Sequence, residues 1–124
     1  MTDDRERTGA AVRREILGDA HVDRPVSAFR APFIEYVTRT AWGEVWSRPG
    51  LDRRTRSCLT LAILAALGHH HELAMHVEAA VRTGVTREEI QEVLLHTTVY
   101  AGTPAGNAAF AIAEKVLDNL ADGP

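Results

Sequence analysis

Cysteine and lysine are almost missing from this chain of 124 residues. The single cysteine, Cys58, lies inside an apolar run and has no second thiol with which to form a disulfide or a CxxC motif. We interpret it as a small buried hydrophobe. Lysine occurs once, as Lys115, while arginine supplies every other basic residue. Chemistry through a lysine Schiff base is therefore not expected.

Long apolar runs and strong net charge are missing as well. The longest apolar run, Cys58–Leu67, is too short to cross a bilayer. The first residues, Met1–Arg14, are charged and lack the apolar stretch of a signal peptide. The formal net charge is −3 with both signs mixed along the chain, which offers no electrostatic basis for binding nucleic acid. We expect a cytoplasmic protein with neither membrane nor nucleic-acid partners.

Helical periodicity is what the chain does contain. Apolar residues recur at spacings of three and four, and no segment alternates as a strand does. With 45% hydrophobic residues the chain is able to build one modest core. We predict a single all-α domain over residues 1–124 with about six helices. They run from a cap at Thr2, Asp3 or Asp4 to about Leu17, over Val26–Trp46, over Arg53–Leu67, from Gly68 to Thr83, from Arg87 to about Tyr100, and from Thr103 to about Leu120.

Several local patterns refine these helices. Gly18–Asp23 is expected to be a turn, and Thr86 with Glu89 has the spacing of a capping box. The helix over Arg53–Leu67 is apolar almost all round after Cys58, so we expect it to be central and covered on most sides. In the preceding helix a helical stripe is formed by Phe29, Phe33, Val37, Ala41 and Val45, with Pro32 as a candidate interruption.

The histidine-rich stretch Gly68–His76 is the first candidate for chemistry. Glu72 and His76 stand one helical turn apart on one face, beside a very apolar partner segment. A carboxylate next to an imidazole is a plausible proton-transfer pair. The alternative is a helix start that is merely rich in histidine, with His76 a satisfied histidine of the core.

An arginine cluster opens the central helix. Arg53, Arg54 and Arg56 crowd its first turn, where positive charge opposes the helix dipole. A bound anion relieves this conflict, and the guanidinium fork matches a carboxylate. The alternative is a set of surface salt bridges to the many acidic residues.

Other site types have less support in the sequence. His71, Glu72 and His76 form HExxxH, one residue longer than the zinc motif HExxH. His69, Glu72 and His76 do share a face and form an alternative divalent-metal set. No nucleophile elbow and no glycine-rich phosphate loop is found. Tyr100 and Asn107 flank a helix start, and Trp42 is most simply a packing residue with a ligand wall as the second reading.

Several motifs together resemble the carboxymuconolactone decarboxylase family, over nearly the whole chain and in order. They comprise Arg14–Val22, Thr40–Gly43, Arg48–Ser57, Leu67–Gly68, Glu72–Leu73 with His76, Gly84–Thr86, Glu89–Ile90, Glu92–Leu95 and Tyr100–Phe110. The wider superfamily includes alkyl hydroperoxidase D proteins, which carry CxxC followed by a histidine. His69 and Glu72 stand at those two cysteine positions, so that redox chemistry does not transfer.

The resemblance implies an alkyl hydroperoxidase D-like helical fold and a homo-oligomer, trimeric or hexameric. It implies conversion of 4-carboxymuconolactone (γ-carboxymuconolactone) to β-ketoadipate enol-lactone and CO₂, in the protocatechuate branch of the β-ketoadipate pathway, without a metal or organic cofactor. Glu72 and His76 carry over as catalytic residues, whereas the run His69–His71 is not a family feature.

The residues fit a decarboxylation chemically. The expected substrate is its own electron sink, because the departing carboxylate sits on a carbon conjugated to the lactone carbonyl. His76 would supply a proton to the dienolate, Glu72 would orient the imidazole, and the arginine cluster would hold the acetate side chain. Tyr100 and Asn107 are candidates for the lactone oxygens. The alternatives are a non-enzymatic or metal-binding module for small acids on the same fold, or an enzyme for a related lactone.

Overall fold

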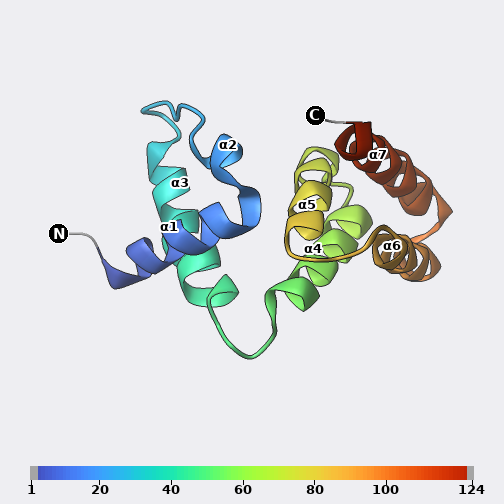
Figure 1. Cartoon of the computed structure of the whole chain (residues 1–124), viewed down its shortest axis with the longest axis horizontal. Helices are drawn as coiled ribbons and strands as arrows, with labels where there is room; N and C mark the ends of the chain where they lie inside the picture. The colour runs from blue at the N-terminus through green and yellow to red at the C-terminus, as the bar shows by residue number, and fades with distance from the viewer. Residues whose placement is uncertain (1–2, 123–124) are drawn as a thin grey trace. The chain divides into compact units, whose positions relative to one another are not determined.

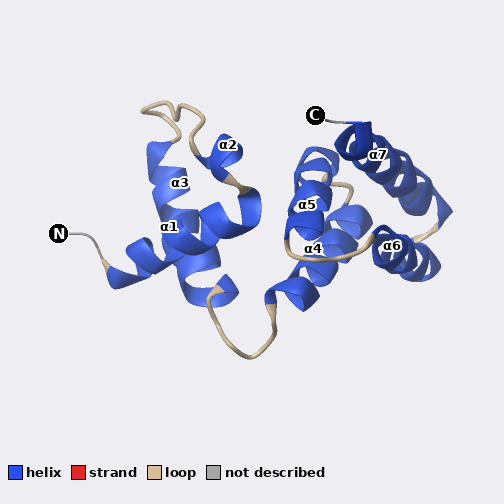
Figure 2. Cartoon of the chain, viewed as in Figure 1, coloured by secondary structure: helices blue, strands red, loops and turns tan. Residues whose placement is uncertain are grey.

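The computed structural model describes residues 3–122 and contains seven α-helices and one π-helix. Along these residues no strand is present, as Figure 2 shows. The all-α prediction is confirmed, although the helices are more numerous than the six expected. The chain divides into two compact units, Met1–Asp52 and Arg53–Pro124, which are described separately below.

The N-terminal unit is built on the contact between its first helix and a π-helix. Its elements are α1 (Asp4–Leu17), α2 (Asp19–Val22), α3 (Ala31–Val37) and η1 (Thr38–Trp46). Asp3 caps α1 by accepting the backbone N–H of Arg5 at 2.8 Å, as predicted, whereas Thr2 lies outside the described residues. Gly9 of α1 lies directly against the backbone of η1 at Thr38 and Gly43. The short helix α2 corrects the prediction of a simple turn over Gly18–Asp23.

The predicted helix over Val26–Trp46 is shorter and changes its winding. It begins only at Ala31, with Pro32 in its first turn, and continues beyond Val37 as η1. The hydroxyls of Thr38, Thr40 and Ser47 each donate to the carbonyl four residues earlier, at 2.6, 2.8 and 2.6 Å. Such side-chain bonds compete with the regular backbone ladder and bend helices, which accounts for the wider turn here.

The helical stripe predicted for this segment is confirmed only in part, because Phe29 lies before α3 begins, and its members do not form one buried face. Phe29 is 94% exposed, and Phe33 and Val45 also face solvent, whereas Thr38 and Trp42 are buried. A four-residue spacing is compatible with more than one face of the same helix. The close approach of α1 at Gly9 selects the face that carries Thr38 and Trp42.

The C-terminal unit packs four helices around one hydrophobic core (Figure 1). The helices are α4 (Arg53–Leu67), α5 (His70–Arg82), α6 (Arg87–Ala101) and α7 (Thr103–Asp122). Leu61 of α4, Val77 of α5, Leu94 of α6 and Ala113 of α7 are all buried in this core. Gly84, with φ at +93°, ends α5 in a conformation that favours glycine. The Thr86–Glu89 capping box at the start of α6 is confirmed by both of its hydrogen bonds.

The central helix α4 is not covered on most sides, contrary to the prediction. Ser57, Leu61 and Ala65 point into the core, but Leu59, Ile63 and Leu67 form an exposed stripe on the opposite side. The other three helices of the unit all contact α4, and within this unit its second apolar face stays open.

None of the helices described between residues 3 and 122 combines the length and the apolar character that spanning a bilayer requires.

Candidate functional site

The two predicted catalytic residues lie on α5 in different environments. His76 is only 9% exposed and belongs to the face that carries Leu73, Val77 and Ala80 into the core. Glu72 is exposed in the first turn of α5, and within residues 3–122 its carboxylate forms no hydrogen bond or ion pair. A buried imidazole with an exposed carboxylate one turn away is what the structure presents. The direct Glu72–His76 contact stays a prediction.

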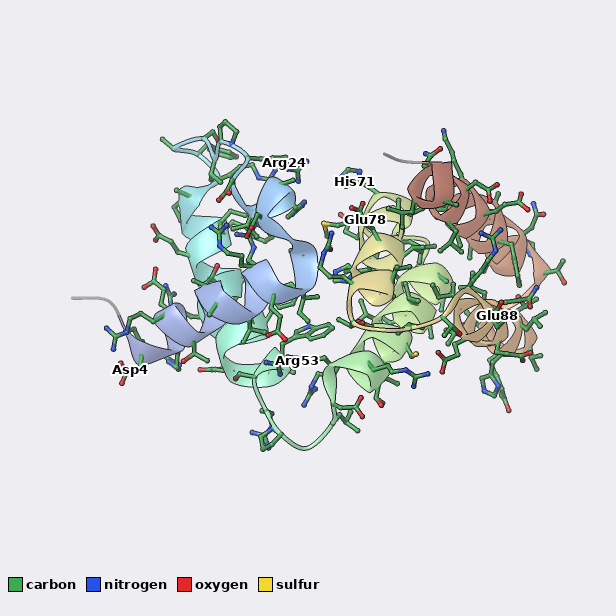
Figure 3. All side chains as sticks on the ribbon, viewed as in Figure 1. Asp4, Arg24, Arg53, His71, Glu78 and Glu88 are labelled. Atoms are coloured by element: carbon green, nitrogen blue, oxygen red, sulfur yellow. The ribbon has the colours of Figure 1, made fainter. Side chains whose placement is uncertain are left out.

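The arginine cluster lies in the first turn of α4, as Figure 3 shows for Arg53. Arg54 forms an ion pair with Glu89 of the α6 capping box. Arg53 and Arg56 are half-buried, and the Nε atom of each is closed off from solvent. The structure thus distinguishes Arg54, which joins α4 to α6, from Arg53 and Arg56, whose Nε atoms are buried.

The register between α4 and α5 determines how far the arginine cluster lies from His76. The two helices are antiparallel, and the hydroxyl of Thr83 at the end of α5 meets that of Ser57 at the start of α4 at 2.9 Å. At a rise of about 1.5 Å per residue, His76 lies roughly 12 Å along the axis from Arg56 and roughly 16 Å from Arg53.

Glu72 is farther still from the arginine cluster, roughly 22 Å from Arg53 along the same axis. In Figure 3 Arg53 and His71 accordingly appear at opposite ends of the α4–α5 hairpin. Of the three arginines, Arg56 lies nearest to His76 along the helix axis.

Tyr100 and Asn107 are not gathered around His76. Tyr100 lies near the end of α6 with 82% of its surface exposed, and its ring centroid is 5.2 Å from that of His96. Asn107 lines a surface groove of about 450 Å³ between α6 and α7, together with Arg87, Gln91 and Phe110. His76 is not among the residues that line this groove.

Trp42 lies in the N-terminal unit, where it is buried and its ring centroid is 5.1 Å from that of Trp46. The tilted contact between the two rings is typical of aromatic packing, which is the role that the structure shows for Trp42 in that unit.

The alternative metal set is not assembled. His69 precedes α5 as its N-cap, Glu72 is exposed and His76 is buried. Among residues 3–122 no three histidine, cysteine or acidic side chains are grouped closely enough to hold one ion.

Sequence reasoning missed Ser57 and Thr83 as members of this region. Ser57 is 1% exposed, and its hydroxyl lies in the contact between α4 and α5. The sequence did contain a signal, because Ser57 has the same helical spacing as the apolar residues Leu61 and Ala65 and is therefore expected on the buried face. A buried hydroxyl requires a hydrogen-bond partner, which would have pointed to a second polar residue nearby.

Comparison with known proteins identifies relatives that match most of the chain. The family model described as carboxymuconolactone decarboxylase matches residues 31–115. A 4-carboxymuconolactone decarboxylase of Acinetobacter baylyi is 48% identical over 97% of this chain and 92% of its own length. A nitrosuccinic acid decarboxylase of Metarhizium robertsii is 40% identical over 92% of this chain and 82% of its own length.

Proposed function

The chain belongs to the carboxymuconolactone decarboxylase family, and we propose that it is a carboxy-lyase that converts 4-carboxymuconolactone to β-ketoadipate enol-lactone and CO₂. The observation that carries the proposal is the 48% identity, over most of both chains, to the 4-carboxymuconolactone decarboxylase of Acinetobacter baylyi. The buried imidazole of His76, with the buried guanidinium nitrogen of Arg56 on the neighbouring helix, supports it from the structure.

The reaction needs an electron sink and one proton. When the bond between the ring carbon and the carboxylate breaks, its electron pair enters the unsaturated lactone and gives a dienolate. His76 as imidazolium donates a proton to the α-carbon, which yields the enol-lactone. Burial of His76 strengthens its electrostatic interaction with the negative charge that develops on the ring.

The second carboxylate of the substrate provides the binding handle. Arg56, with Arg53 behind it, holds the acetate arm through charge-assisted hydrogen bonds. In this proposal the arginines bind the acetate carboxylate and not the departing carboxylate, because strong binding of the departing charge would stabilise the ground state. Glu72, one helical turn away on α5, is proposed to orient the imidazole of His76. Tyr100 and Asn107 remain candidates for hydrogen bonds to the lactone oxygens, and Trp42 remains a candidate for one wall of the substrate pocket.

Assembly into a homo-oligomer, trimeric or hexameric, is part of the proposal. The exposed stripe of Leu59, Ile63 and Leu67 on α4 supports it, because an apolar stripe on a central helix is typical of a surface that a partner covers. Light scattering of the intact chain tests the assembly, and Ile63→Glu should lower the measured mass.

The whole chain is proposed to be one domain with the alkyl hydroperoxidase D-like fold, because the family match extends across both units. A cytoplasmic location fits the single cysteine.

The test is turnover of carboxymuconolactone generated enzymatically in the same cuvette. We expect loss of the lactone absorbance with release of one CO₂ per molecule, and activity that survives dialysis against EDTA. Activity that disappears on dialysis and returns with one added divalent ion would replace the cofactor-independent mechanism. Tight binding of the lactone without turnover would favour a non-enzymatic small-acid module, and turnover of only another lactone would change the substrate.

Nitrosuccinate is a second candidate substrate, favoured by the 40% identity to the nitrosuccinic acid decarboxylase. Both acids lose a carboxylate from a carbon whose electron pair is then delocalised, into a lactone in one case and a nitro group in the other. Both also retain a second carboxylate. Parallel assays with the two acids, compared by kcat/KM, decide which of them this chain prefers.

A further inference from the structure

A buried pair of hydroxyls joins the two helices that carry the proposed site. The Thr83 hydroxyl donates to the Ser57 hydroxyl at 2.9 Å, with Ser57 1% exposed and Thr83 half-buried. Ser57 directly follows Arg56 on α4, and Thr83 is the C-cap residue of α5.

The surrounding contact between α4 and α5 is apolar. Leu61 and Ala65 of α4 share the core with Leu73, Val77 and Ala80 of α5. Apolar contacts are non-directional and tolerate small axial shifts, whereas a hydrogen bond requires its two atoms at a fixed distance and angle. The Ser57–Thr83 bond is a directional contact that joins the start of α4 to the end of α5, at the end of the hairpin away from the Gly68–His69 connection.

We propose that Ser57 and Thr83 are positioning residues that set the distance between the carboxylate-binding start of α4 and His76. This inference rests on the proposed function, in which one substrate spans Arg56 and His76. Their axial separation of roughly 12 Å follows from the register that the hydroxyl pair holds. Because a misplacement of about 1 Å is able to cost a hundredfold in rate, control of this register determines which length of dicarboxylate fits.

Variants of the pair separate positioning from folding. In Ser57→Ala the Thr83 hydroxyl still has the carbonyl of Ala80 at 2.9 Å as an acceptor, so no buried donor is left without a partner. Thr83→Val removes the hydroxyl at nearly the same volume, and Thr83→Ser retains it. Thr97→Val is the matched control, because the buried Thr97 hydroxyl bonds within α6, to the carbonyl of Val93, and joins no second helix.

The experiment measures binding of succinate, glutarate and adipate to the intact chain by calorimetry, alongside kcat and KM for the lactone. We expect the unaltered chain to prefer one length. Ser57→Ala and Thr83→Val should weaken that acid about five- to tenfold and the other two less than twofold, whereas Thr83→Ser and Thr97→Val should retain the full preference.

Three results would overturn the inference: no length preference in the unaltered chain, the full preference retained in Ser57→Ala and Thr83→Val, or equal weakening of all three acids. Binding of the dicarboxylates is measured without turnover, so the two ideas fail in different ways. If the proposed function is wrong, the chain will not turn over the lactone, but its length preference for dicarboxylates can still be measured.

Discussion

Arg54 at the start of α4 forms an ion pair with Glu89, and the other carboxylate oxygen of Glu89 accepts the backbone N–H of Thr86 at 2.9 Å. One acidic side chain thus closes the capping box of α6 and ties the first turn of α4 to it. The arrangement gives Arg54 a structural role at the junction of α4 and α6.

We therefore expect Arg54→Gln to affect stability rather than catalysis. Both partners are more than a third exposed, so the loss in unfolding free energy should stay within about 1 kcal/mol. Glu89→Ala removes the reciprocal cap as well and should cost about 1 kcal/mol more. Urea unfolding measures both, and a tenfold drop in kcat/KM for a folded Arg54→Gln would contradict this assignment.

Arg53→Lys and Arg56→Lys test the carboxylate site. Lysine keeps the charge but loses the bidentate fork, so at least one variant should lose about tenfold to several hundredfold in kcat/KM. That range corresponds to a charged hydrogen bond of about 1.5–3 kcal/mol. Arg56 is the better candidate because it lies nearer to His76. If both variants retain the kcat/KM of the unaltered chain, the cluster does not bind the substrate.

His76→Asn should act mainly on kcat, because its proton is needed only as the dienolate forms. General acid catalysis is worth about a hundred- to ten-thousandfold, and the loss should fall in that range. Glu72→Gln should lower kcat less, since Glu72 acts through His76. His96→Gln, on the exposed face of α6, is the matched control and should leave both constants unchanged. Normal turnover by a folded His76→Asn would remove His76 from the mechanism.

Gly9→Ala should destabilise the N-terminal unit. A Cβ at Gly9 would overlap the carbonyl oxygen of Thr38 and stand 2.9 Å from the backbone nitrogen of Gly43, and neither backbone atom moves cheaply. Overpacking of this kind costs about 1–3 kcal/mol. Gly50→Ala is the matched control, because a Cβ there meets nothing within 4 Å. Equal unfolding midpoints for the two variants would show that α1 and η1 separate easily.

Asp23 should titrate below its ordinary pKa of 3.8, because hydrogen bonds from Arg14 favour its charged form. Arg14 also bonds Asp19, at 2.9 Å to each carboxylate. A lowered folded-state pKa means that this stabilisation is present above the unfolded pKa and is lost as the pH falls through the folded value, hence below about pH 4. NMR titration should show the Asp23 pKa returning to its ordinary value in Arg14→Gln. An Asp23 pKa that is the same in both proteins would contradict this cause.

Local signals determined much of the secondary structure. The limits of α4, the Asp3 cap of α1 and the Thr86–Glu89 box of α6 all follow from residues within one turn of each helix end. Such capping depends on side chains that reach their own backbone, so a short stretch of sequence is sufficient to predict it. The family could also be recognised, because its motifs recur in order along the chain.

The tertiary structure alone decided which faces are covered and which side chains meet. Helical spacing predicts that Phe29 and Phe33 share a face, but the contact of α1 with η1 buried Trp42 and left both phenylalanines exposed. In the same way, the three arginines of the first turn of α4 look equivalent in the sequence, but in the structure Glu89 of α6 pairs with Arg54. The axial separation of roughly 12 Å between Arg56 and His76 depends on the Ser57–Thr83 register, since that pairing joins residues on two different helices. Periodicity within one helix does not encode an alignment between two, because that alignment depends on contacts between residues far apart in the chain.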